Sequence, residues 1–156
     1  ERIKKKAIYL MADYKKEIIN SLKWYDKNKN SSLITKGNGY IIINAQDQIR
    51  STLIGTLASI LSKSNGTKEK FIMSMAQLID GTTKISLRMC GINNGVDLKQ
   101  IIVDIIKDMP NCEAGGHTNA AGALISTDME DEFIDKAKVV LEKNAMEEIV
   151  WFNQGY

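Results

Sequence analysis

Residues 113–126 have the sequence EAGGHTNAAGALIS and contain the only histidine of the chain. Gly115 and Gly116 directly precede His117, and glycine reaches backbone dihedrals that let neighbouring N–H groups converge on one point. Such concave sets of N–H groups bind anions, and an adjacent imidazole adds a further donor for phosphate. The stretch therefore predicts a turn that holds an anion site, followed by a buried strand. Gly-Gly-His is also typical of an ordinary turn, so the motif needs support from the rest of the chain.

The residues after the histidine bear on the same site. If Thr118 and Asn119 open a short helix, its free N–H groups and dipole add to the attraction for an anion. Asn119 then belongs to the candidate site together with the two glycines and the histidine. The small residues 120–122 would let this turn lie close to the rest of the fold.

A second candidate element is the strand expected at residues 84–89. Lys84, Ser86 and Arg88 share one face of this strand, because side chains alternate along it, and apolar residues take the other face. The polar face either points to solvent, as strand arginines usually do, or points into the cleft beside the Gly-Gly-His turn. In the second case Arg88 would hold phosphate through paired N–H donors, with Ser86 in support.

Hydrophobic periodicity predicts the elements of the first half of the chain. We expect an amphipathic helix over residues 1–27 and two strands, at 32–36 and 39–45, the second buried on both faces. A helix should follow from about Asp47 and end at residues 64–66. These elements alternate helix and strand, as in an α/β protein.

The second half continues the alternation. Residues 71–78 and 84–89 predict a hairpin, and Asp97 predicts the cap of a helix that ends before Pro110. Thr127 and Glu130 have the spacing of a capping box for the last helix. The expected fold is thus α/β, a mixed β-sheet flanked by helices and preceded by a long N-terminal connector helix.

Several further expectations concern the organisation of the chain. Residues 1–30 are interpreted as the connector helix and residues 31–156 as one domain. Because the chain begins at Glu1, we expect it to be part of a longer protein. Residues 149–152 are expected to form a strand or a docked tail. Gly55 lies inside a predicted helix, where glycine costs about 1 kcal/mol against alanine, and this indicates close packing there.

Composition limits the function classes. The net charge is +2, so the chain has no general attraction for nucleic acid or membranes and an anion site must be local. No apolar run approaches the ~20 residues that span a bilayer, and no signal peptide is visible. The two cysteines are expected to be free thiols of a cytoplasmic protein.

Three patterns together resemble the C-terminal DHH-associated, substrate-binding domain of the DHH phosphoesterases. Residues 115–122 resemble its Gly-Gly-His-x-x-Ala-Ala-Gly signature, residues 85–88 its Ser-Leu-Arg strand, and residues 53–61 its helix with Gly-x-x-Ala. The resemblance covers roughly residues 45–127. It departs from the family pattern at Met89 and at residues 112–114, where the family often has further glycines.

The resemblance implies a division of labour. An upstream DHH domain of the same chain would hold manganese and hydrolyse the substrate, while the domain seen here would close over the cleft. Carried over by position, Gly115, Gly116 and His117 would contact phosphate, and Arg88 would hold phosphate from across the cleft. Glu113 would repel phosphate unless its side chain points away. With one histidine and dispersed acids, we expect no catalytic residue, metal ligand or cofactor in this part of the protein.

The preferred hypothesis is that the chain is part of a RecJ-like single-strand exonuclease, and the helix with Gly55 favours this type. Its partners would be single-stranded nucleic acid or a short oligonucleotide and the upstream catalytic domain, with a homodimer left open and no membrane. One alternative is a non-catalytic tRNA-binding or dimerisation module like that of alanyl-tRNA synthetases. Another is a nucleotide or cyclic-dinucleotide phosphodiesterase domain.

Overall fold

A six-stranded mixed sheet with the strand order β1-β2-β3-β4-β6-β5 forms the centre of the protein. The computed structural model describes residues 1–64, 68–93 and 95–153. The strands are β1 (Ile34–Gly37), β2 (Tyr40–Asn44), β3 (Phe71–Gln77), β4 (Thr82–Met89), β5 (Glu113–His117) and β6 (Ala120–Ser126). The helices are α1 (Arg2–Asn28), α2 (Ile54–Ser62), α3 (Leu98–Ile106) and α4 (Glu130–Asn153), with the 3-10 helix η1 (Thr127–Met129) before α4. β2 and β3 run parallel and the other four neighbouring pairs antiparallel, which confirms the mixed α/β fold.

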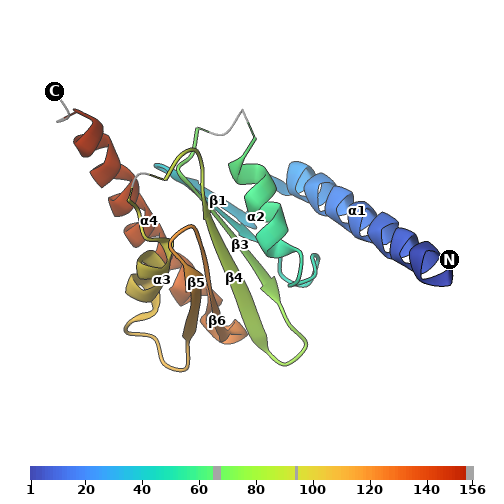
Figure 1. Cartoon of the computed structure of the whole chain (residues 1–156). Coiled ribbons are helices and arrows are strands. Elements are labelled where there is room, and N and C mark those ends of the chain that lie inside the picture. Colours follow the sequence, from blue (N-terminus) through green and yellow to red (C-terminus); the bar gives the residue numbers. More distant parts are fainter. Residues whose placement is uncertain (65–67, 94, 154–156) are drawn as a thin grey trace.

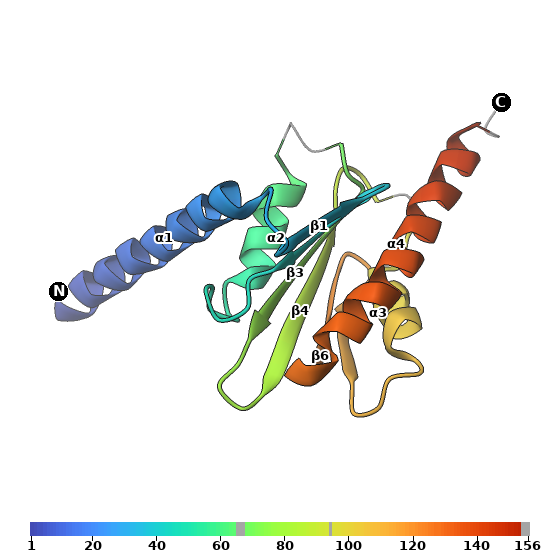
Figure 2. The same ribbon diagram turned by 180° about the vertical axis from the view of Figure 1, so that it is seen from behind.

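Helices cover both faces of the sheet, α1 and α2 on one side and α3 and α4 on the other (Figure 1; Figure 2). The core against α3 and α4 contains alternate residues of the central strands, such as Phe71, Met73 and Leu87. The residues between them, such as Ile72, pack on the side of α1 and α2. All of residues 40–43 are buried, so the prediction of a strand covered on both faces is confirmed.

Helix α1 packs on the domain through its C-terminal half and extends away from the sheet at its N-terminal end (Figure 1). Leu22 and Trp24 pack against the cluster beneath α2, whereas Ile3 is 85% exposed. The long N-terminal helix is therefore confirmed, and its role as a connector stays a prediction. No helix in the described residues is long and apolar enough to cross a membrane.

The predicted start of the second helix is wrong. Residues 46–53 form turns and bends, with hydrogen bonds from the Gln48 N–H to the Ala45 carbonyl and from the Leu53 N–H to the Arg50 carbonyl, and α2 begins at Ile54. Ile49 and Leu53 are nevertheless buried beneath α2, so their apolar spacing reflects burial and not a helical conformation. Part of the predicted end, residues 65–66, lies outside the described residues.

Three further predictions near the chain end are wrong. The Gly-Gly-His motif belongs to strand β5, and Thr118 and Asn119 form the turn of the β5–β6 hairpin rather than a helix start. Residues 149–152 continue helix α4, which ends at Asn153. The capping box does not form: no side chain caps η1, and the Glu130 carboxylate is buried.

Buried Glu130 links α4 to the sheet instead of capping a helix. Its carboxylate accepts hydrogen bonds from Thr83 Oγ1 at 2.7 Å and from Asn44 Nδ2 at 3.1 Å. Gln77 Nε2 also donates to both carboxylate oxygens, at 3.1 and 3.3 Å. These three partners lie on β2, β3 and β4, so one carboxylate joins three strands to the start of α4.

Candidate functional site

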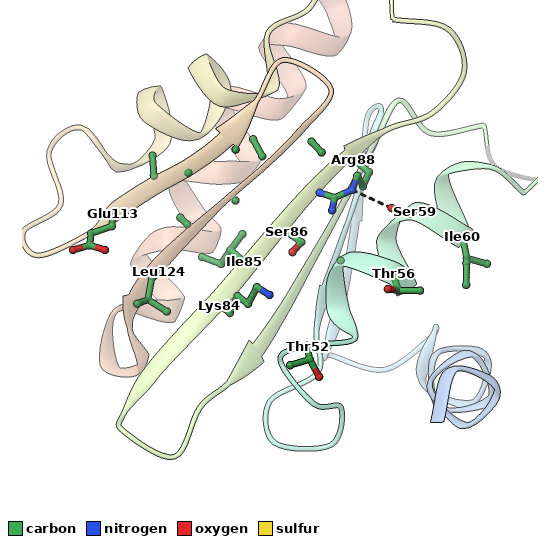
Figure 3. Close-up of a pocket in the computed structure, with 18 of the residues that line it drawn as sticks. Thr52, Thr56, Ser59, Ile60, Lys84, Ile85, Ser86, Arg88, Glu113 and Leu124 are labelled. Atoms are coloured by element: carbon green, nitrogen blue, oxygen red, sulfur yellow. Dashed lines mark hydrogen bonds between the residues drawn. The ribbon is translucent and has the colours of Figure 1, made fainter. Parts of the chain in front are cut away.

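Helix α2 leaves part of its face of the sheet uncovered, and this creates a groove of about 870 Å³. The helix packs mainly on β3 and β4, and β6 and β5 continue the sheet beyond them. Three parts of the chain line the groove: α2 with the turn before it, the polar face of β4, and the β5–β6 hairpin (Figure 3).

The hairpin provides a floor of small residues. Buried and half-buried residues alternate along β6, and the half-buried set, which includes Ala120 and Gly122, faces the groove. Gly122 is required by the close approach of β4, since a Cβ there would overlap the carbonyl oxygen of Ile85. A Cβ at Gly115, in contrast, would meet nothing within 4 Å. Its lack of a side chain therefore keeps the groove open and serves no packing need.

Arg88 projects from β4 into the groove and is held in one orientation (Figure 3). Its Nε donates to Ser59 Oγ of α2 at 3.0 Å, and its Nη1 donates to the Leu87 carbonyl at 2.9 Å. No carboxylate in the described ranges forms an ion pair with it. Burial lowers the pKa of the guanidinium from its ordinary value, yet an arginine stays charged in proteins. The groove therefore contains an oriented cation whose Nη2 has no acceptor among the described residues.

Ser86 lies beside Arg88 and is only 5% exposed. Its hydroxyl lines the groove and makes no hydrogen bond to any described residue. Buried polar groups are almost always paired, so an unpaired hydroxyl at the edge of a cavity indicates a place for a ligand or water.

Gly55 of α2 makes the close contact with β4 that the sequence indicated. A Cβ at this position would lie 3.1 Å from Arg88 Nη2 and 3.4 Å from Ser86 Oγ. The glycine therefore leaves room for the guanidinium beside the helix.

The structure separates the predicted site residues into two sets. Arg88, Ser86, Gly115 and Gly116 line the groove, whereas His117 and Asn119 lie outside its lining. The strand register, with Leu87 opposite Ala121 and His117 opposite Ala120, puts the main chains of His117 and Arg88 two strands apart, about 10 Å.

His117 is exposed at the end of β5. Its Nδ1 accepts a hydrogen bond from the Asn119 N–H at 3.2 Å, so the neutral imidazole carries its proton on Nε2. The preceding Gly116 has a φ of +99°, in the left-handed region that favours glycine. The assignment of His117 and Asn119 to phosphate binding stays a prediction.

The groove also contains charged residues that were not assigned to the site from sequence. Lys84 on β4 and Lys63 at the end of α2 add two cations, and Glu113 on β5 adds one anion. The shared face of Lys84 and Arg88 was the signal for Lys84. No local pattern identifies Lys63, because only the packing of α2 brings it to the groove.

The described residues include no cluster of three or more His, Cys, Asp or Glu side chains that would hold a metal ion. Both cysteines are free and half-buried. The described residues therefore offer no set of ligands that fits manganese.

The DHHA1 domain family matches residues 37–143, more than half of the chain, and the protein belongs to this family. This confirms the resemblance to the domain that accompanies the DHH domain of phosphoesterases. A search of curated proteins finds no match.

Solved structures with the same fold include two kinds of protein. The C-Ala domain of alanyl-tRNA synthetase from Aquifex aeolicus is 14% identical, with a TM-score of 0.55, and the match covers 70% of this chain and 97% of that one. RecJ from Thermus thermophilus in complex with Mg²⁺ is 14% identical, with a TM-score of 0.58, over 82% of this chain and 18% of RecJ. RecJ in complex with Mn²⁺ matches equally well over 17% of its chain. This chain thus spans less than a fifth of RecJ, and at these identities the likeness shows the fold alone.

Proposed function

We propose that this chain is the substrate-binding domain of a manganese-dependent DHH phosphoesterase of the RecJ-like single-strand exonuclease type. In this proposal the groove binds a phosphate of single-stranded nucleic acid or a short oligonucleotide. The observation that carries it is the pairing of an oriented, unneutralised Arg88 with the buried, unpartnered hydroxyl of Ser86 in one cavity of the described structure. Membership of the DHHA1 family supports the phosphoesterase assignment.

The chemistry of the groove suits phosphate binding. Arg88 is fixed by two hydrogen bonds, so little side-chain freedom is lost when its Nη2 donates to a phosphate oxygen. Partial burial strengthens a charge-assisted hydrogen bond, because the effective dielectric constant falls away from bulk water. The Ser86 hydroxyl adds a second donor. Bond cleavage, with its manganese, is assigned to a catalytic DHH domain upstream in the same polypeptide.

Binding of a 5′-phosphorylated single-stranded hexanucleotide, followed by fluorescence anisotropy, tests the proposal. Arg88→Ala should weaken binding by at least about tenfold, as expected for loss of one charge-assisted contact. Arg50→Ala is the matched control, since Arg50 lies outside the groove and pairs with Glu17 at 3.5 Å. His117→Ala tests the imidazole separately. Wild-type affinity in a folded Arg88→Ala variant would overturn the proposal.

A second candidate is a non-catalytic module that binds tRNA or a second copy of the chain. The observation that favours it is the match over 97% of the C-Ala domain. The sequence upstream of this chain distinguishes the two: an Asp-His-His motif supports the phosphoesterase, and a synthetase editing domain supports the module.

A further inference from the structure

We propose that Lys84 forms a second phosphate subsite, so that β4 guides the backbone of a nucleic-acid strand along the groove instead of holding one terminal phosphate. This inference rests on the proposed function, because it requires a phosphate at Arg88. It adds a residue and a direction to that site: the sugar-phosphate backbone follows the β4 and α2 wall, and the bases lie over the β5–β6 hairpin.

The first argument is the row of donors along β4. Lys84, Ser86 and Arg88 alternate with buried apolar residues, and all three side chains lie on the side of β4 that faces α2 (Figure 3). Four residues of strand place the Lys84 main chain about 13 Å from that of Arg88. Nucleotides of one stacked strand advance about 3.4 Å each, so the row is as long as about four stacked nucleotides and fewer extended ones. Because two hydrogen bonds hold Arg88 in place, a phosphate bound there lies at one end of this row and Lys84 at the other.

The second argument is that no described residue neutralises the charge of Lys84. The side chain is half-buried in the groove wall, and in the described part of the chain no carboxylate forms an ion pair with it. A cation kept at a groove wall without a partner attracts an anionic ligand. Thr52 lines the groove near this end, and its side chain is neutral.

The third argument concerns the opposite wall. Leu124 of β6 pairs with Lys84 on one side and with Glu113 on the other, so these three residues form one row across the sheet. The two charged residues are therefore two strand spacings apart, about 10 Å between main chains. Glu113 repels phosphate, and this confines the backbone to the Lys84 side of the groove.

The floor between these walls suits bases. Ala120, Gly122 and Leu124 face the groove without a charged group, and Gly115 leaves open space above β5. Small and apolar residues exclude few shapes and make no base-specific hydrogen bonds, so the predicted binding is tolerant of sequence.

The test compares two probes that differ in phosphate number: thymidine 5′-monophosphate and 5′-phosphorylated (dT)4, titrated at several salt concentrations. Lys84→Met should weaken (dT)4 binding about fivefold and make the slope of the log association constant against log salt less steep by about 0.7. The affinity for the monophosphate should stay within twofold of that of the wild type. Lys84→Arg should restore most of the (dT)4 affinity. Lys36→Met is the matched control, since Lys36 is an exposed strand lysine on β1, at the far edge of the sheet.

Circular dichroism of each variant establishes that it is folded. Equal losses for both probes in Lys84→Met would overturn the inference, because Lys84 would then act on the first phosphate. Unchanged (dT)4 binding in Lys84→Met, with a loss in Arg88→Ala, would also overturn it while leaving the proposed function intact. Unchanged binding in both variants would overturn the proposed function as well.

Discussion

Replacement of Gly55 by alanine should separate stability from ligand binding. The added methyl group would lie 3.1 Å from Arg88 Nη2, a few tenths of an ångström closer than an ordinary contact. Because this nitrogen is at the end of the side chain and is not one of the two that hydrogen bonds hold, a shift of a few tenths of an ångström relieves the overlap. The backbone of α2 gains about 0.5–1 kcal/mol when a helical glycine becomes alanine. The free energy of unfolding should therefore stay equal or rise by up to about 1 kcal/mol.

Ligand binding should respond in the opposite direction. Nη2 is the guanidinium nitrogen without an acceptor in the described residues, and the alanine methyl group would cover it and displace it. Loss of about 1 kcal/mol in one charge-assisted hydrogen bond corresponds to roughly fivefold weaker binding of a phosphorylated oligonucleotide. A Gly55→Ala variant that is as stable as the wild type but binds fivefold more weakly is the expected result.

A double-mutant cycle with Arg88→Ala provides the control. If the methyl group acts through the guanidinium, Gly55→Ala should change binding by less than twofold once Arg88 is absent. Urea unfolding gives the stability and fluorescence anisotropy gives the affinity of all four proteins. Full affinity in the single variant, or an equal loss with and without Arg88, would refute the role assigned to Nη2.

Three further predictions concern Glu130, Gly122 and Cys90. Glu130→Ala should lower the free energy of unfolding by about 2–3 kcal/mol in urea, because donors on three strands lose their acceptor; a loss below about 0.5 kcal/mol on the same scale contradicts this. Gly122→Ala should cost at least about 2 kcal/mol, since its methyl group meets the Ile85 carbonyl oxygen, and an unchanged thermal midpoint argues against that contact. Burial raises the pKa of the Cys90 thiol from 9.0 to about 11, so alkylation at pH 8, followed by mass spectrometry, should be on the order of 100-fold slower than in an unfolded peptide. Equal alkylation rates in the folded protein and the peptide would speak against this shift. Because the folded state holds the thiol proton more tightly, the contribution of Cys90 to stability is complete below the unfolded pKa and is lost as the pH rises towards 11.

The elements that sequence predicted well are those whose signals are local. Asp97 caps α3 by accepting from the backbone N–H groups of residues 99 and 100, as its position before an apolar periodic run predicts. The alternation of β4 predicted correctly which side chains share its polar face. These outcomes depend on one residue and its near neighbours along the chain.

The wrong predictions arose where distant residues decide the local structure. The dihedral freedom of Gly115 and Gly116 predicts a turn with converging N–H groups, but pairing with β6 makes these residues part of a strand. Glu130 had the spacing of a capping residue, yet side chains from three strands draw its carboxylate into the interior. Local preference is weak beside such tertiary contacts.

The sequence alone determined the alternation of helices and strands, the polar face of β4 and the family resemblance, because these depend on residue type and spacing. Only the tertiary structure decided that α2 covers mainly β3 and β4, that Ser86 is buried without a partner in the described residues and that Lys84 and Glu113 lie in one row with Leu124 between them. The physical reason is that a groove is defined by what neighbouring elements leave uncovered. That depends on the packing of segments far apart in the chain.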